Sequence, residues 1–426
     1  MRAFAYLPRL LRNCSTSSSS CPTPLHLVLY TASACSLCGR FKADLSRFLQ
    51  QPERTHISVQ EVDISTAPRE IFERRGNPTE APLRRQPHDQ DPRGMGSRTG
   101  VIAVHGGVSF NPSTSLHSTC QEALLSSDKP DLIGAIKFLE NCPNFNCGTG
   151  SNLTMHGRIE CDASFMSSDE LRYGAVSCVS RLKNPCEVAK SIAEDTSLSA
   201  ISMVQPMTLV GFGAHQWAKE RGFDLIEEDE LISKKAKQMH EQGLNYLDSS
   251  MQPSTSAQLD TVGGLASDTN GSSLEVVSSS GGLFMKPDGR LGSSATFGAS
   301  CWAEKRHDLT VGITVSGCGE ALIRTNFARS LAEAIFSSDD DALPADVLRS
   351  WFDNSFLCSP LLTRMQPHNR LAGGLVFFSS PYTAELISFH NTPSLPFAYF
   401  SKNKCKSYLS VSPSSDRVTI NSFILK

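Results

Sequence analysis

The sequence predicts an α+β protein whose strands and helices form layers around a large core. Apolar, β-prone runs occur in close pairs, such as 261–267 and 274–280, as expected for hairpins. Amphipathic helices are predicted at 131–142 and 327–336, and the order of elements is not a strict strand–helix alternation. With 426 residues, the chain is long enough for two or three domains, or for one large layered domain with an appendage.

The remaining elements of this main region are predicted from apolar periodicity and turn residues. Strands are expected at 101–107, 172–181, 308–315, 373–378, 385–389 and 397–401. Helices are expected at 184–196, within 207–222 after a short strand, and at 226–240. The polar stretch 241–259 is expected to be an unstructured loop.

Composition excludes several classes of partner. The net charge of −3 comes with no sustained basic face, so we expect no direct contact with nucleic acid. No apolar run approaches the roughly 20 residues that span a bilayer. The 14 cysteines are scattered through apolar and helical contexts, which is typical of reduced thiols in an intracellular protein. We expect no metal site and no cofactor, because no second Cys/His pair has suitable spacing.

The N-terminal segment differs from the rest of the chain. Residues 1–25 contain Arg2, Arg9 and Arg12, no acidic residue and a run of serines. This composition is typical of a mitochondrial transit peptide, and equally of a disordered N-terminus.

Residues 26–76 are predicted to form a partial thioredoxin-like unit. A strand at 26–30 leads to Cys35 and Cys38, which precede an amphipathic helix and a second strand at 57–64. The segment resembles the glutaredoxin-like family, which implies thiol–disulfide exchange at Cys35 and Cys38. The second half of such a fold is missing, because residues 77–100 are rich in Pro, Arg, Asp and Gly and are typical of a linker.

Thr261 stands at an unusual position, directly between the predicted loop and a predicted strand. If the chain is cut after Asp260, Thr261 gains a free amine beside its own hydroxyl. An amine of this kind has an ordinary pKa near ~8, so it can accept the hydroxyl proton at neutral pH. A threonine at a strand start is usually only a β-former, so the chemistry depends on the surrounding motifs.

Three glycine-rich motifs accompany Thr261. SSSGGLFMKPDGRLG (278–292) and VSGCGE (315–320) each place hydroxyl groups beside glycines, and FNCGTGSNL with GRIECDAS (145–164) is expected to form a third loop of this kind. Glycines let backbone N–H groups approach a ligand closely, and such groups can stabilise an oxyanion.

Together these motifs resemble the type 2 asparaginase superfamily, and within it most closely the threonine aspartases (taspases). The resemblance covers about residues 101–401. It implies a four-layer αββα sandwich of the N-terminal-nucleophile hydrolases, made by self-cleavage into an α fragment (101–260) and a β fragment (261–426) that stay associated. It also implies a dimer of such αβ units.

The resemblance assigns a role to each matching residue. Thr261 is implied as nucleophile and base, with Ser280 holding its amine or hydroxyl. Ser316 and Gly317 are implied to shape the oxyanion site, and Gly107 and Asn146 to lie near the scissile bond. Arg290 is implied to receive a substrate carboxylate, which a guanidinium fork matches well.

Ser293 separates two branches of the superfamily. Asparaginases place an aspartate three residues after this arginine to hold the free amine of the substrate. A peptide has no free amine there, so Ser293 favours an endopeptidase that cuts protein substrates after an exposed aspartate. The resemblance to taspases implies that it acts in the cytoplasm and nucleus. The alternative is the mitochondrion, if the N-terminal segment is a transit peptide. The alternatives are an isoaspartyl peptidase/L-asparaginase, a glutaredoxin-like oxidoreductase and a non-processing binding module.

The sequence departs from the family pattern at HGGVS (105–109) and NCGTG (146–150), and in two further features. The stretch between Phe110 and Asn146 is shorter by roughly one helix, and Ser273 is an additional residue before the Ser-Gly-Gly turn. A bulge at Ser273 is expected to displace Ser280 relative to Thr261.

Overall fold

The computed structural model describes residues 25–31, 57–63, 99–109, 115–127, 130–198, 203–249, 261–339, 341–412 and 417–425. The chain divides into two units, Met1–Gly94 and Met95–Lys426. No helix in the described part of the chain is long and apolar enough to cross a bilayer.

The first unit contains two described strands, β1 (Leu25–Thr31) and β2 (Ile57–Asp63), which pair in parallel. Both strands were expected from the sequence. A parallel pair alone does not establish a thioredoxin-like fold, and the structure does not support that assignment. Cys35, Cys38, the predicted helix between the strands and most of the linker lie outside the described residues.

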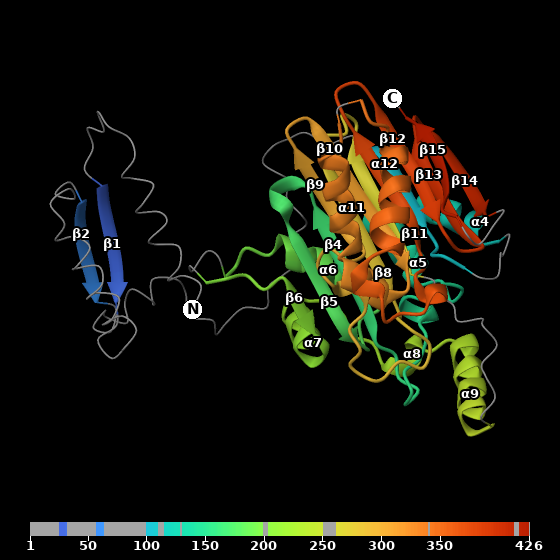
Figure 1. The fold of residues 1–426 in the computed structure, drawn as a ribbon. Coiled ribbons are helices and arrows are strands. Elements are labelled where there is room, and N and C mark those ends of the chain that lie inside the picture. The colour runs from blue at the N-terminus through green and yellow to red at the C-terminus, as the bar shows by residue number, and fades with distance from the viewer. Residues whose placement is uncertain are drawn as a thin grey trace. The chain divides into compact units, whose positions relative to one another are not determined.

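The second unit contains two packed sheets (Figure 1). The larger has eight strands in the order β14-β13-β3-β7-β8-β4-β5-β6, and only β5 and β6 pair in parallel. Its strands are β3 (Thr99–His105), β4 (Cys161–Ser167), β5 (Tyr173–Val179), β6 (Thr208–Val210), β7 (Val262–Asp268), β8 (Leu274–Ser280), β13 (Ser394–Ser401) and β14 (Lys404–Val411). The smaller, in the order β15-β12-β11-β10-β9, consists of β9 (Cys301–Arg306), β10 (Leu309–Gly317), β11 (Ala372–Ser379), β12 (Ala384–His390) and β15 (Thr419–Ile424).

Helices contact both sheets. Those that contact the larger sheet are α4 (Leu116–Leu124), α5 (Leu132–Glu140), α6 (Pro185–Glu194) and α7 (Gly211–Glu220). Those that contact the smaller sheet are α10 (Gly319–Thr325), α11 (Phe327–Phe336) and α12 (Pro344–Trp351). The order helix–sheet–sheet–helix agrees with the predicted layered α+β class and is consistent with an N-terminal-nucleophile type of domain.

Two further helices, α8 (Glu228–Leu231) and α9 (Lys234–Ser249), follow α7 along the chain. Single helical turns complete the structure at η3 (Gly148–Gly150), η4 (Asp169–Leu171), η6 (Ser293–Ala295), η7 (Phe352–Leu357), η8 (Pro360–Leu362) and η9 (Pro367–Asn369).

The packing of α11 shows why the sequence forms these layers. Phe327, Leu331 and Ile335 recur at a spacing of four residues and are all buried in the core around the smaller sheet. The Phe327 ring meets those of Phe356 and Trp351 edge-on, at centroid distances of 4.8 and 4.9 Å. Burying each large side chain of this kind contributes about 1.5–3 kcal/mol.

The predicted loop at 241–259 is wrong over its first part, because α9 continues to Ser249. Gly243 is buried, and a Cβ there would lie 2.7 Å from the Phe284 ring. The imidazole of His240 contacts the carbonyl of Met155 at 3.2 Å. These tertiary contacts favour the helix over the loop that the polar composition indicates.

The predicted loop around GRIECDAS is also wrong, because residues 161–164 belong to β4 in the middle of the larger sheet. Every residue of β4 is buried, since one face of the strand packs toward helices and the other toward the second sheet. The carboxylate of Asp162 in this strand is hydrogen-bonded inside the sandwich. The sequence pattern missed α4, β9, α10, α12, β14 and β15 altogether.

The expected bulge at Ser273 is absent. Strands β7 and β8 pair without a register shift from Val262–Ser279 to Ser267–Leu274. Ser273 lies in the turn between them, where Asp268 accepts its backbone N–H at 3.2 Å. The extra residue is therefore absorbed by the turn and does not displace Ser280. The shortened stretch before Asn146 still contains both α4 and α5.

Candidate active site

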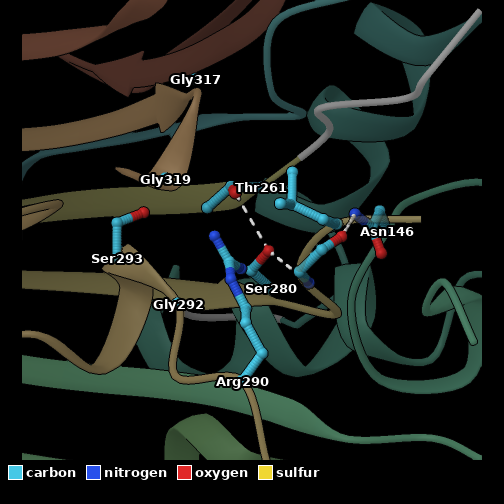
Figure 2. A pocket seen from close by; sticks show the side chains of 10 residues that line it. Asn146, Thr261, Ser280, Arg290, Gly292, Ser293, Gly317 and Gly319 are labelled. Carbon is cyan, nitrogen blue, oxygen red and sulfur yellow. Dashed lines mark hydrogen bonds between the residues drawn. The ribbon is translucent and has the colours of Figure 1, made fainter. Parts of the chain in front are cut away.

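A small cavity lies where β7 begins (Figure 2). Its lining comes from four segments: the loop before β4, the start of β7, the end of β8 with the loop that leads to η6, and the end of β10 with the start of α10. The lining residues are Asn146, Thr261, Ser280, Gly282, Leu283, Arg290, Gly292, Ser293, Gly317 and Gly319.

The hydroxyl and the backbone N–H of Thr261 are both hydrogen-bonded. Its hydroxyl donates to Ser280 Oγ at 3.1 Å, and its backbone N–H donates to Ser316 Oγ at 3.2 Å. Pairing of Val262 with Ser279 places Ser280 beside Thr261 within the larger sheet. Ser316 comes from β10 in the facing sheet. The structure thus brings these three predicted residues together.

Asn146 fixes the turn that follows Ser280. Its Nδ2 donates to the carbonyl of Gly282 at 2.8 Å, and its Oδ1 accepts the N–H of Asn152 at 2.8 Å. A Cβ on Gly281 would lie 2.4 Å from that Oδ1, so only glycine fits the turn. Asn146 therefore stabilises the turn that follows Ser280, and it also lines the cavity.

Gly317 lines the cavity, whereas Gly107 does not. The N–H of Gly107 donates to His105 Nδ1 at 3.2 Å. The next residue, Val108, donates its N–H to Ser316 Oγ at 3.2 Å. Gly107 is thus placed behind Ser316 and is not among the residues that line the cavity. Its expected position near the scissile bond stays a prediction, because Asp260 lies outside the described residues.

A buried histidine supports the first residues of β7. His105 Nε2 contacts Thr314 Oγ1 at 3.2 Å, and Thr314 Oγ1 donates to the carbonyl of Val277 at 3.2 Å. Burial lowers the pKa of His105 to about 3, so the ring is neutral. Gly263 passes directly over this group, where a Cβ would lie 1.9 Å from Thr314 Oγ1.

Arg290 supplies the positive charge of the cavity. Its Nε and Nη2 both donate to Glu320 Oε1, at 3.0 and 2.8 Å. Figure 2 shows the side chain reaching toward Thr261 and Ser280. The sequence pattern did not single out Glu320, although it is the last residue of the VSGCGE motif.

Ser293 lines the cavity and is buried at the start of η6. The preceding loop is anchored by Asp162, whose Oδ2 accepts the N–H of Gly292 at 2.8 Å. The other oxygen of Asp162 accepts the Ser177 hydroxyl at 2.6 Å. None of the lining residues carries a carboxylate.

A buried carboxylate lies behind Ser279, the neighbour of Ser280. Glu140 Oε1 accepts the Ser279 hydroxyl at 2.7 Å and the N–H of Cys186 at 3.1 Å. Burial raises the pKa of Glu140 from 4.5 to about 7, although these hydrogen bonds act in the opposite direction.

We expect this carboxylate to make stability depend on pH. The folded protein keeps a proton on Glu140 between pH 4.5 and about 7 that the unfolded chain releases. Stability therefore falls as pH rises through this interval. The free energy of unfolding, relative to that of Glu140→Gln, is expected to fall by roughly 3 kcal/mol. Urea unfolding at several pH values measures the difference in unfolding free energy between the two proteins. The titration of His105 contributes equally to both and so cancels from this difference. A difference that stays constant with pH would contradict the prediction.

Several predicted site residues cannot be placed. Asp260 and the possible redox pair Cys35 and Cys38 lie outside the described residues. Within the described ranges, no group of three His, Cys, Asp or Glu side chains could hold a metal ion.

The fold and the cavity define an N-terminal-nucleophile type of hydrolase, with a threonine at the start of a central strand. The family model described as asparaginase matches residues 117–344, which is more than half of the chain. The chain belongs to this type 2 asparaginase family.

Curated relatives agree with this assignment. The isoaspartyl peptidase/L-asparaginase of Mus musculus is 31% identical over 247 residues, which cover 54% of this chain and 70% of the mouse protein. The isoaspartyl peptidase of Escherichia coli is 30% identical over 254 residues, covering 54% of this chain and 75% of that protein. A plant-type L-asparaginase of Thermococcus kodakarensis is 32% identical over 213 residues, covering 47% of this chain and 64% of that protein.

Proposed function

We propose that the chain is a self-processing threonine endopeptidase that cuts protein substrates after aspartate. The observation that carries the proposal is the lining of the cavity: Arg290 is the one charged residue among the lining residues, and its partner Glu320 is not among them. A substrate carboxylate has a cationic partner there. A substrate amine has no carboxylate partner, because Ser293 occupies the position that the aspartate of asparaginases would take.

The first step of the proposed mechanism is self-cleavage. The Thr261 hydroxyl attacks the carbonyl of Asp260 and forms an ester, the amide C–N bond breaks, and the hydroxyl proton passes to the departing nitrogen of Thr261. Water then hydrolyses the ester and releases Asp260 as a carboxylate. Ser280 holds the attacking hydroxyl, at 3.1 Å in the uncut chain. The product is a free amine on Thr261, beside its own Oγ1.

In each later turnover the Thr261 amine accepts the hydroxyl proton while Oγ1 attacks the carbonyl of the substrate aspartate. Ser316 and the backbone at Gly317 would stabilise the tetrahedral oxyanion, and Arg290 would hold the aspartate side chain. The leaving amine takes the proton, and water hydrolyses the acyl-enzyme.

The sheet order supports lasting association of the two fragments. In the larger sheet β3 of the α fragment pairs with β7 and β13 of the β fragment, and β4 pairs with β8. Dimerisation of αβ units is part of the proposal. So is a site of action in the cytoplasm and nucleus, with the mitochondrion as the alternative.

The second candidate is an isoaspartyl peptidase/L-asparaginase, which the names of the mouse and bacterial relatives favour. Such an enzyme must hold the free amine of its substrate. The neutral Ser293 side chain is the feature that disagrees with this candidate.

Cleavage assays distinguish the two candidates. We expect purified protein to cut a blocked peptide with an internal aspartate, and the same peptide with asparagine or glutamate at least about 100-fold more slowly. Hydrolysis of β-aspartyl dipeptides and L-asparagine is expected to be negligible. The reverse order of activities would establish the second candidate in its place.

A further inference from the structure

The arginine proposed to bind the substrate already has an anionic partner. Both Nε and Nη2 of Arg290 donate to one oxygen of Glu320, at 3.0 and 2.8 Å. Two charge-assisted hydrogen bonds at these distances are strong in a partly dry site. A substrate carboxylate therefore arrives at a guanidinium whose charge is already balanced.

The two partners differ in their freedom to move. The Arg290 side chain is only 12% exposed, whereas that of Glu320 is 43% exposed. Glycines enclose the guanidinium, because a Cβ on Gly319 would lie 2.5 Å from Nη2 and one on Gly292 would lie 3.0 Å from Nη1. The arginine is thus fixed by its surroundings. Glu320 can turn into solvent and be rehydrated at little cost.

We propose that Glu320 is a built-in competitor for the carboxylate subsite, an inference that rests on the proposed function. The subsite opens only when a substrate carboxylate displaces Glu320 from Arg290. Displacement breaks the two hydrogen bonds between Arg290 and Glu320, so it reduces the affinity for every acidic ligand. An aspartate within a polypeptide makes additional contacts along the chain that offset this reduction. Free small carboxylates have no such contacts and bind more weakly.

A purely structural role for Glu320 predicts the opposite result. If the carboxylate only orients Arg290, its loss would weaken substrate binding. Glu320→Gln separates the roles because it keeps the acceptor oxygen and removes the charge. Glu320→Ala removes both, which shows how much orientation contributes.

The test measures binding of N-acetyl-L-aspartic acid amide, which carries a single carboxylate, to processed protein by titration calorimetry. We expect Glu320→Gln to lower the dissociation constant about tenfold, and the KM for an aspartyl peptide by a similar factor. Arg290→Gln is expected to abolish binding. Glu333→Gln is the matched control, because Glu333 is 42% exposed and pairs with Arg306 outside the cavity; its dissociation constant should equal that of the wild type.

An unchanged or raised dissociation constant in Glu320→Gln would overturn the inference. Cleavage after aspartate by the wild type, with such a result, would leave the proposed function standing and reject the competitor alone. Absence of both binding and cleavage in every variant would reject the inference and the proposed function together.

Discussion

Thr261→Ala is expected to remain a single uncut chain and to lose peptidase activity by roughly four to six orders of magnitude. The substitution removes the hydroxyl that donates to Ser280, and no neighbouring group can replace it as a nucleophile while the chain stays uncut. A denaturing gel with intact-mass analysis measures processing, and hydrolysis of an aspartyl peptide measures activity. In the wild type we expect one fragment to end at Asp260 and the other to begin at Thr261.

Thr261→Ser is the matched control, since it keeps the hydroxyl and loses only a methyl group. It should process slowly and retain measurable activity. A folded wild-type protein that stays intact on the gel, or a Thr261→Ala protein that is cut at the same bond, would contradict the proposed mechanism.

The second large effect is expected on stability, from Gly263→Ala. The new Cβ would lie 1.9 Å from Thr314 Oγ1 and 2.6 Å from His105 Nε2. Both atoms are buried and hydrogen-bonded to each other, so they cannot move away from the new Cβ without breaking that hydrogen bond. We expect the free energy of unfolding to fall by about 3 kcal/mol or more. Urea unfolding in the Thr261→Ala background keeps the chain uncut for this measurement.

Gly213→Ala is a suitable control for this substitution. Gly213 lies within α7, and a Cβ there would meet nothing within 4 Å. Alanine should raise stability by about 0.5–1 kcal/mol, because it is the better helix former. Equal changes in unfolding free energy for the two substitutions would contradict the prediction that a side chain at Gly263 is too crowded.

The layered α+β class and most central elements were predictable from the sequence because their apolar periodicity is strong. Helix α11 and strands β7 and β8 are examples. Strand β4 was not predictable. Its buried Asp162 and Ser164 interrupt the apolar pattern that would indicate a strand, so the segment has the composition of a loop.

The candidate site was predictable where it depends on local motifs and not where it depends on tertiary pairing. Ser280 and Gly317 border the cavity with Thr261, as their motifs indicate. The pairing of Arg290 with Glu320 joins residues 30 positions apart on different elements, and no local pattern shows it. The contact of the residue after Gly107 with Ser316 likewise depends on tertiary pairing, since Val108 donates its N–H to Ser316 Oγ on β10, a strand distant in sequence.

The interleaved sheet has a consequence for refolding. Before the proposed cut, β3 and β7 belong to one chain, so their pairing is an intramolecular event with a high effective concentration. After the cut, the same pairing joins two polypeptides, and recovery from complete unfolding becomes a second-order process that slows on dilution. Self-cleavage would thus convert a protein that can refold alone into one whose native state, once lost, is regained only by encounter of its two halves.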